Sequence, residues 1–254
     1  MITAAFAVMI VTAAPGARAQ QRTGAPASDQ SAREAAPIDL TGQWVAIISE
    51  DWRWRMTTPA KGDYASIPLS AEGKRVADLW DPGRDEAAGE QCKGYGAPGV
   101  MRGPTRLRIT WQDDVTLKLE TDYGMQTRLL RFRGAPASAA PSWQGVTTAQ
   151  WVMAAAGGRG EGRSAAGRRY GSLKTATSSL RPGYLRKNGA PYSARATYTE
   201  YWDVHQERNG EQYLVVTSVA DDPRYLQIPW ITSLHFKKEN DPGKWDPTPC
   251  SARF

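Results

Sequence analysis

The chain has 254 residues, of which 41% are hydrophobic, and a formal net charge of +6. This composition allows one sizeable folded domain. The two histidines and two cysteines show no metal-ligand spacing, which argues against a structural zinc site. Without a Walker loop or a strand-linked G-x-G-x-x-G motif, no nucleotide cofactor is expected.

The first twenty residues have the features of a secretory signal peptide. An apolar run from Ile2 to Ala14 is followed by the small-residue pattern of residues 17–19, typical of a cleavage site. The alternative is a transmembrane anchor, but about 13 apolar residues are too few to cross a bilayer. Residues 21–37 are polar and rich in Ala and Pro, which predicts a disordered leader. We therefore expect a periplasmic or secreted protein with one domain over residues 38–254.

Residues 38–254 have mainly the pattern of β-structure, because apolar and polar side chains alternate along many segments. Tight polar turns within residues 105–132 predict an antiparallel meander. The pair Asn209-Gly210 predicts a hairpin, since both residues accept a positive φ. The predicted strands are residues 41–49, 53–58, 105–111, 115–121, 125–132, 143–153, 173–180, 194–206, 212–219 and 229–238.

One helix is expected over residues 71–80, with Ser70 as its N-cap and Asp81-Pro82 as its end. Its inward-facing side chains are expected to be Val76, Leu79 and Trp80. Helical periodicity is otherwise absent, which favours a closed all-β barrel or a sandwich over βαβ units.

Residues 154–172 interrupt the strand pattern with a Gly-, Ala- and Arg-rich insertion that has no periodicity. One interpretation is a flexible surface loop. The other is a basic lid over the barrel mouth, whose arginines meet an acidic ligand. Because the positive charge gathers in this loop rather than on a helix or an aromatic sheet face, nucleic-acid binding is not expected.

Cys92 and Cys250 are the only cysteines in the chain. In an oxidising compartment an isolated pair usually forms a disulfide, and this one would tie the C-terminal tail to an early loop. A catalytic thiol is disfavoured, because neither cysteine has a nearby His or a C-x-x-C partner.

Four candidate catalytic residues lie on two of the predicted strands. Tyr201, Asp203 and His205 share one face of the strand over residues 194–206, and His235 lies on the closing strand. If that face points into the barrel, the four side chains can carry general acid–base catalysis. The plainer interpretation is a solvated His205 beside a hairpin turn and a buried, hydrogen-bonded His235. No metal and no cofactor are predicted.

The segment from Glu50 to Arg55 alternates carboxylates, indoles and guanidiniums. On a strand, Trp52 and Trp54 would share a face and pack an aromatic ligand, while Asp51 or Arg53 held its polar end. The alternative is a surface strand with cation–π contacts.

Several aromatic residues lie in loops rich in Gly and Pro, where functional side chains are common. They are expected to line the barrel mouth, or alternatively to plug its end. Of these, Tyr184 and Tyr225, together with Trp230, are the predicted substrate-binding residues. The tyrosines of the set are Tyr64, Tyr95, Tyr184, Tyr192 and Tyr225.

Gly42-Gln43-Trp44 resembles the G-x-W signature that opens lipocalin barrels, in which the Trp packs against a C-terminal Arg. Longer stretches, such as LTGQWVAIISEDWRWRM and DDPRYLQIPWITSLHFKK, resemble a family of exported proteobacterial proteins, mostly hypothetical. This resemblance implies export and a barrel, and it supplies no catalytic residues. The predicted fold is all-β: an antiparallel lipocalin-like (calycin-like) β-barrel of about 8–10 strands with one short helix.

Phenolic acid decarboxylases and carotenoid hydratases are a distant architectural analogy: lipocalin-like barrels that act without a bound cofactor. The first functional hypothesis is therefore an exported, cofactor-independent lyase or isomerase for a hydrophobic aromatic or terpenoid molecule. Its reaction would be a decarboxylation, elimination, hydration or double-bond shift. The second is a lipocalin-like carrier for such a molecule, and the third a structural role in the envelope. Stable membrane insertion is not expected, and the oligomeric state, including a homodimer, stays open.

Overall fold

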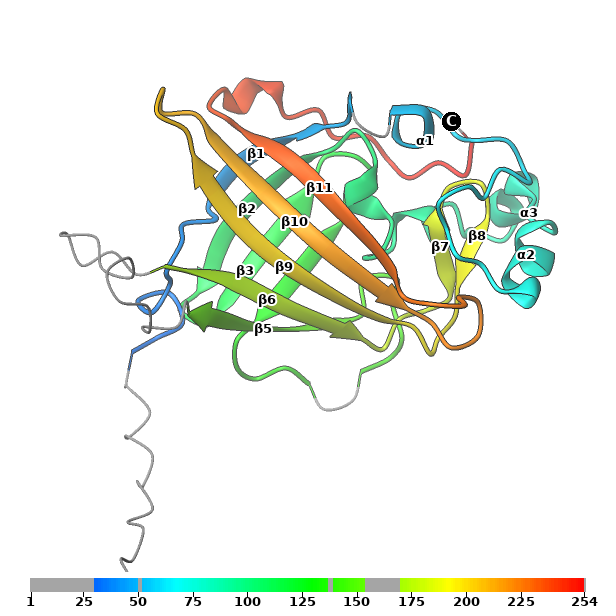
Figure 1. Cartoon of the computed structure of the whole chain (residues 1–254), viewed down its shortest axis with the longest axis horizontal. Coiled ribbons are helices and arrows are strands. Elements are labelled where there is room, and N and C mark those ends of the chain that lie inside the picture. The colour runs from blue at the N-terminus through cyan, green and yellow to red at the C-terminus, as the bar shows by residue number, and fades with distance from the viewer. Residues whose placement is uncertain (1–29, 50–51, 137–138, 154–169, 254) are drawn as a thin grey trace, which may run out of the picture.

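The computed structural model describes residues 30–49, 52–136, 139–153 and 170–253 (Figure 1). The predicted signal peptide, most of the leader and most of the insertion at residues 154–172 lie outside these ranges.

Nine strands among the described residues form a closed barrel, with neighbours in the order β1-β11-β10-β9-β6-β5-β4-β3-β2 (Figure 1). The predicted all-β barrel is thereby confirmed. Its strands are β1 (Gly42–Ile47), β2 (Arg106–Asp113), β3 (Thr116–Thr121), β4 (Thr127–Arg131), β5 (Val146–Met153), β6 (Gly171–Ser178), β9 (Thr197–Gln206), β10 (Gln212–Asp221) and β11 (Trp230–Glu239).

One strand pair departs from the antiparallel expectation. Strands β4 and β5 pair in parallel, with Leu130 opposite Thr147. A parallel pair needs a long connection instead of a tight turn, and the chain between Arg131 and Val146 supplies it. Alternating apolar residues predict a strand without fixing its direction relative to a neighbour.

Strands β7 (Gly183–Arg186) and β8 (Ala190–Tyr192) form a separate two-stranded hairpin at one end of the barrel (Figure 1). The expectation that Tyr184 and Tyr192 lie in loops is therefore wrong. The turn of this hairpin contains Asn188-Gly189, with Gly189 at φ +87°, which is the same signal that correctly predicted the β9–β10 hairpin at Asn209-Gly210.

The predicted helix exists but is shorter than expected. Helix α2 (Ala71–Ala77) begins at Ser70, whose hydroxyl accepts a hydrogen bond from the Gly73 amide at 3.0 Å. The chain leaves the helix after Ala77, so Leu79 is 61% exposed and the expectation that it faces inward is wrong. Asp81 caps a second helix, α3 (Pro82–Ala87).

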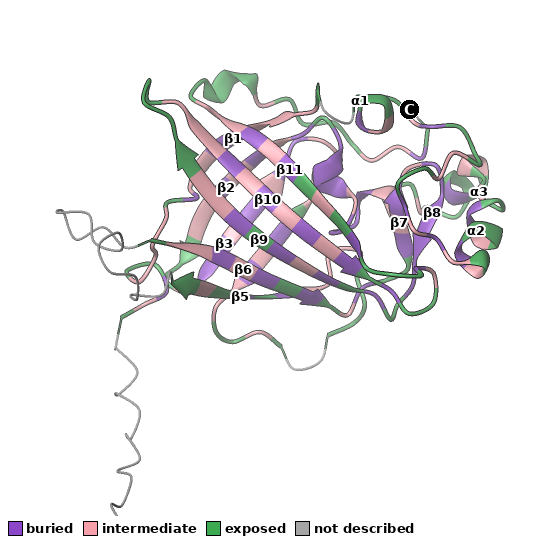
Figure 2. Ribbon diagram, viewed as in Figure 1, coloured by how far each residue is buried: buried purple, intermediate pink, exposed green. Residues whose placement is uncertain are grey.

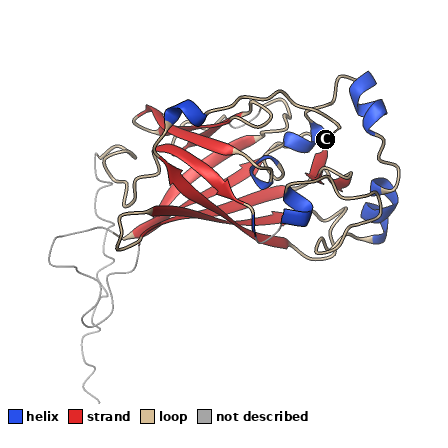
Figure 3. Ribbon diagram, turned by 90° about the horizontal axis from the view of Figure 1, so that it is seen from above, coloured by secondary structure: helices blue, strands red, loops and turns tan. Residues whose placement is uncertain are grey.

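The helical turns gather mainly at one end of the barrel, as Figure 3 shows from above. We call α2, α3, η2 (Lys93–Tyr95), η3 (Val100–Arg102) and the β7–β8 hairpin the cap; within it, α2 contacts β8 and η2 contacts β7. Two further helical elements of the described residues are α1 (Trp52–Arg55) and η4 (Pro242–Lys244). No described helix is both long and apolar enough to cross a membrane.

Burial alternates along the barrel strands (Figure 2), as period-two side-chain geometry requires. Ten large apolar side chains that point into the barrel are at most 1% exposed. A space large enough for water would leave the side chains around it accessible. Among the described residues, these ten therefore form a packed core with no aromatic-lined hollow between them, and the partly buried Trp111, Phe132, Trp151 and Val204 pack against it. The ten are Trp44, Leu107, Ile109, Leu117, Leu119, Leu173, Trp202, Leu214, Val216 and Phe236.

The tryptophan of the G-x-W segment closes this core. Trp44 is fully buried, and its indole N–H donates to the Leu40 carbonyl at 2.9 Å. The lipocalin resemblance implied an arginine over this ring, but the cation found there is Lys238 of β11, with its Nζ 4.3 Å from the ring centroid.

Cys92 and Cys250 form the predicted disulfide, with their Cα atoms 5.0 Å apart. The bond fastens the C-terminal tail beside η2. A second apolar core lies under the cap, separate from that of the barrel, and includes Leu69, Ala77, Leu185, Tyr192 and Trp230.

Candidate functional site

The four residues predicted to be catalytic lie on the outer face of the barrel. Tyr201 is 37% exposed, His205 is exposed, and Asp203 and His235 are half-buried. The alternate residues of β9 fill the interior, with Trp202 fully buried. This polar face therefore does not point into the barrel, which was the condition for a shared catalytic site there, because packing the Trp202 indole inward removes more apolar area from water.

On the outer face, Asp203 of β9 and His235 of β11 lie on either side of β10. Asp203 lies opposite Val215 on β10, and Val215 lies opposite His235 on β11. Two strand spacings of about 4.8 Å separate the backbones of Asp203 and His235. Tyr201 instead lies under Lys174, whose Nζ is 5.6 Å from the ring centroid.

The segment predicted to hold an aromatic ligand is helix α1 instead of a strand. Successive residues of a helix turn by about 100°, so Trp52 and Trp54 do not share a face; Trp52 is 62% exposed and Trp54 is half-buried. The Arg53 guanidinium lies 5.3 Å from the Trp54 ring and pairs with Asp63 at 2.8 Å. The cation–π contact of the alternative interpretation is present, but on a helix instead of the surface strand that it assumed. Asp51 lies outside the described residues.

A cleft of about 360 Å³ opens between α2, α3 and the β7–β8 hairpin. We call it the cap cleft. Its size lies within the range of roughly 300–1,000 Å³ typical of small-molecule sites. Four aromatic side chains line it: Trp80, Tyr184, Tyr192 and Tyr225. Charged side chains line it too: Asp81, Arg84, Asp85 and Lys93.

Two glycines allow the cleft walls to approach closely. A Cβ at Gly189 would lie 2.2 Å from the Cβ of Trp80, so the hairpin turn packs directly against the end of the α2 segment. A Cβ at Gly183 would lie 2.5 Å from the hydroxyl of Tyr192, a ring that is only 1% exposed. The walls are therefore held by close backbone contacts.

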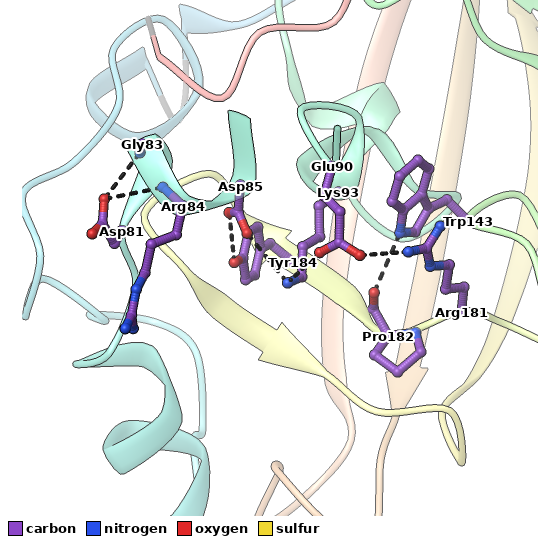
Figure 4. A network of polar contacts seen from close by, with 10 residues as sticks. All are labelled: Asp81, Gly83, Arg84, Asp85, Glu90, Lys93, Trp143, Arg181, Pro182 and Tyr184. Atoms are coloured by element: carbon purple, nitrogen blue, oxygen red, sulfur yellow. Dashed lines mark hydrogen bonds and ion pairs between the residues drawn. The ribbon is translucent and has the colours of Figure 1, made fainter. Parts of the chain in front are cut away.

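A polar network, shown in Figure 4, includes the cleft-lining residues Asp85, Lys93 and Tyr184 and extends beyond them to Glu90 and Arg181. The Tyr184 hydroxyl donates to Asp85 Oδ2 at 2.8 Å, and Lys93 donates to Asp85 Oδ1 at 3.3 Å and to Glu90 at 3.1 Å. Arg181 also pairs with Glu90. Burial, assisted by the Asp85 carboxylate, raises the pKa of Tyr184. The phenol thus stays protonated and remains a hydrogen-bond donor at neutral pH.

The structure brings together two predicted binding residues, Tyr184 and Tyr225, in the cap cleft. Trp230 lies outside it and is 6% exposed, with the Arg102 guanidinium 4.7 Å from its ring. Tyr184 belongs to a short strand instead of a loop, as does Tyr192.

Sequence reasoning missed the charged wall of the cap cleft. Asp85 and Lys93 belong to a polar stretch that reads as solvated surface, and Asp85 meets Tyr184 across 99 residues of chain. No local pattern reports such a contact. Trp80 was expected to face inward, and it lines the cleft while half-buried.

Within the described residues, no group of three or more His, Cys, Asp or Glu side chains is placed to hold a metal ion. No family model, no curated protein and no solved structure matches this chain.

Proposed function

We propose that this protein binds a small hydrophobic molecule with an aromatic ring in the cap cleft. The observation that carries the proposal is the cleft of about 360 Å³, in which Trp80, Tyr184 and Tyr225 present partly exposed rings; the fourth aromatic residue of the lining, Tyr192, is only 1% exposed. Aromatic side chains stack on aromatic ligands through offset or edge-to-face contacts. Among the described residues, the packed barrel core leaves no space for a hydrophobic ligand. In a lipocalin-like carrier the ligand lies inside the barrel; in this protein we place it in the cap cleft instead.

The polar wall gives the cleft a means of orienting its ligand. Arg84 lines the same space as the aromatic rings, and a cation attracts a carboxylate or phenolate on the ligand; Lys93, also in the lining, is already paired with Asp85 and Glu90. Asp85 accepts hydrogen bonds there. We therefore favour an aromatic acid or phenol over a pure hydrocarbon.

Export is part of the same proposal. The apolar N-terminal segment with its small-residue cleavage pattern and the Cys92–Cys250 disulfide support a periplasmic or secreted protein, because disulfides persist in oxidising compartments. A ligand of this kind is best sought by mass spectrometry of small molecules that co-purify with the exported protein.

Replacing Tyr225 by alanine is expected to weaken binding of a probe, 4-hydroxycinnamate, by about tenfold, since one aromatic contact contributes about 0.5–1.5 kcal/mol beyond its buried area. Isothermal titration calorimetry measures this change. Tyr201→Ala removes the same side chain from the outer face of the barrel and is the matched control. Equal effects of the two substitutions would contradict the placement of the site.

A second candidate function is a cofactor-independent lyase or isomerase acting on the bound molecule. The specific observation in its favour is the pairing of Asp85, which is 7% exposed, with the Tyr184 hydroxyl at 2.8 Å in the cleft wall. A carboxylate and a protonated phenol side by side provide a base and an acid for proton transfer. Lys93 balances the charge of Asp85.

If this second function holds, Asp85→Asn is expected to lower turnover by about 10²- to 10⁴-fold, the usual contribution of one general acid or base. His235→Ala is expected to leave the rate unchanged, because His235 lies on the outer face of the barrel. The measurement is turnover of aromatic carboxylic acids without added cofactor. If His235→Ala lowered the turnover rate and Asp85→Asn did not, the reaction would take place on the outer face of the barrel and not in the cap cleft.

A further inference from the structure

Two Asn-Gly pairs of this chain lie in hairpin turns, in different surroundings. Asn209-Gly210 joins β9 to β10 at the end of the barrel away from the cap, and Asn188-Gly189 joins β7 to β8 within the cap (Figure 1). The backbone nitrogen of a glycine can attack the side-chain amide of a preceding asparagine, because no Cβ hinders the close approach. The two pairs therefore share one local chemistry and differ in what the fold places around them.

The turn at Asn209 orients the reacting groups and leaves them open to water. Asn209 and Gly210 are both exposed. The Asn209 side-chain oxygen accepts the backbone N–H of Glu211 at 3.0 Å, which folds the side-chain amide back over the next peptide unit. The same N–H stabilises the negative charge that this oxygen gains when its carbon is attacked. Among the described residues, chain neighbours aside, no heavy atom lies within 4 Å of the position of a Cβ at Gly210.

One hydrogen bond must open before the Gly210 nitrogen can react. Its N–H donates to the Glu207 carbonyl at 3.0 Å, and the nitrogen has to leave that bond to reach the amide carbon. Solvent-facing turns open at little cost in free energy, in contrast to the strands of a core. The Glu207 N–H also donates to the Glu211 carbonyl at 2.8 Å, and this bond at the base of the turn can stay formed. The barrel therefore does not need to unfold for the reaction.

Asn188 has the same following residue but is enclosed. Asn188 is 0% exposed, and its Nδ2 donates to the Ala60 carbonyl at 3.1 Å and to the Asp63 carbonyl at 2.8 Å. A Cβ at Gly189 would lie 2.2 Å from the Cβ of Trp80, so the turn is packed against the end of the α2 segment. The leaving nitrogen is thus held in place, and water reaches this amide only after local unfolding of the cap.

We propose that Asn209 is a site of non-enzymatic deamidation, and that the fold protects Asn188 from the same reaction. The Gly210 nitrogen loses its proton to a base in solution and forms a bond to Cγ of Asn209. Nδ2 takes up a proton and leaves as ammonia, which gives a cyclic succinimide. Water then breaks either of the two bonds between the ring nitrogen and a carbonyl carbon, and the product is an aspartate or an isoaspartate. The net reaction consumes water and releases ammonia.

The product changes the charge of the hairpin and, as an isoaspartate, its backbone. Asn209 lines a polar cleft of about 310 Å³ together with Lys237 and Lys238, so the new carboxylate lies in a cleft that two cations line. An isoaspartate adds a CH₂ group to the main chain, which displaces the hydrogen bond between Glu207 and Glu211. The tip of the hairpin is therefore expected to fray, at the end of the barrel away from the cap cleft (Figure 1).

The test incubates the intact wild-type protein in mildly alkaline buffer and follows deamidation by peptide mass spectrometry. Tryptic digestion places Asn188, Asn209 and Asn240, the three asparagines of the sequence, in separate peptides. Asn209 is expected to convert at least about tenfold faster than Asn188, since Asn188 reacts only through local unfolding. It should also convert faster than Asn240, which is exposed but is followed by Asp241 instead of a glycine. Isoaspartyl and aspartyl peptides are separated by chromatography, and finding both identifies the succinimide route.

The same incubation in guanidinium chloride with a reductant separates the effect of the fold from that of the sequence. In the unfolded chain Asn188 and Asn209 keep only their following glycines, so most of the difference in rate should disappear. A rate at Asn209 no higher than at Asn188 or Asn240 in the folded protein would overturn the proposal. A difference between Asn188 and Asn209 that persists unchanged in the denaturant would overturn it as well. Because no ligand is added, neither result bears on the cap-cleft proposal.

Discussion

Replacing Glu200 by alanine is expected to lower the free energy of unfolding by about 3–5 kcal/mol, the cost of breaking a buried ion pair. The side chains of Glu200 and Arg128 are 0% and 1% exposed, and Oε2 of Glu200 lies 2.6 Å from Nη2 of Arg128. A second contact joins Oε1 to Nη1 at 2.9 Å. Without the carboxylate, the guanidinium remains in the barrel core with no counter-charge from Glu200.

Two threonine side chains form hydrogen bonds with this ion pair. The Thr175 hydroxyl donates to Glu200 Oε2 at 2.9 Å, and Arg128 donates to the Thr177 hydroxyl at 3.3 Å. Strands β4, β6 and β9 thus share one hydrogen-bonded layer within an otherwise apolar core. This geometry satisfies the carboxylate, and losing it also leaves the Thr175 hydroxyl without that acceptor.

Chemical denaturation in urea, followed by tryptophan fluorescence, measures the effect of Glu200→Ala. The matched control is Glu120→Ala, which breaks the partly exposed pair with Lys118 at 3.0 Å and should change stability by about 0–1 kcal/mol. A combined Arg128→Met and Glu200→Leu variant should recover most of the loss, because it removes both charges from the core. If Glu200→Ala costs no more than Glu120→Ala, the ion pair does not stabilise the barrel as inferred.

Removing the disulfide by Cys92→Ser and Cys250→Ser is expected to lower the free energy of unfolding by about 4–5 kcal/mol. The two residues are 158 positions apart, and closing so long a loop strongly reduces the entropy of the unfolded chain. The tail keeps other contacts, since the Gly124 amide donates to the Thr248 carbonyl and the Thr248 amide to the Asp122 carbonyl, each at 2.9 Å. The folded state should therefore persist with reduced stability.

The disulfide prediction is measured by urea denaturation of the wild-type protein with and without a reductant. The double serine variant provides the control, because its midpoint should not respond to the reductant. A reductant that leaves the wild-type midpoint unchanged would show that the bond contributes little to the native state.

Local sequence signals predicted much of the fold correctly. The alternation around Leu107 and Ile109 gave a strand with both side chains in the core, since period-two burial is visible in a few residues. Two further predictions were correct: Ser70 as the N-cap of α2 and the hairpin at Asn209-Gly210. Both features depend on the chemistry of adjacent residues.

Two errors arose where local patterns allow more than one structure. In β9, large side chains occupy both faces, and the pattern alone does not say that Trp202 points inward and Tyr201 outward. Trp52 to Arg55 is too short for its period to separate a helical turn from a strand. In both cases the surrounding fold decides, since the choice that buries more apolar area is favoured.

The sequence by itself determined the all-β class, the main strands, the N-cap residue of helix α2, the β9–β10 hairpin and the disulfide. Each of these depends on neighbouring residues or, for the disulfide, on a single pair of cysteines. Only the tertiary structure decided which face of β9 is buried and where the cap cleft lies. Asp85 and Tyr184 meet across 99 residues, and Lys187 reaches Tyr95 across 92. Such contacts follow from how the cap packs on the barrel end, and no short-range pattern encodes that packing.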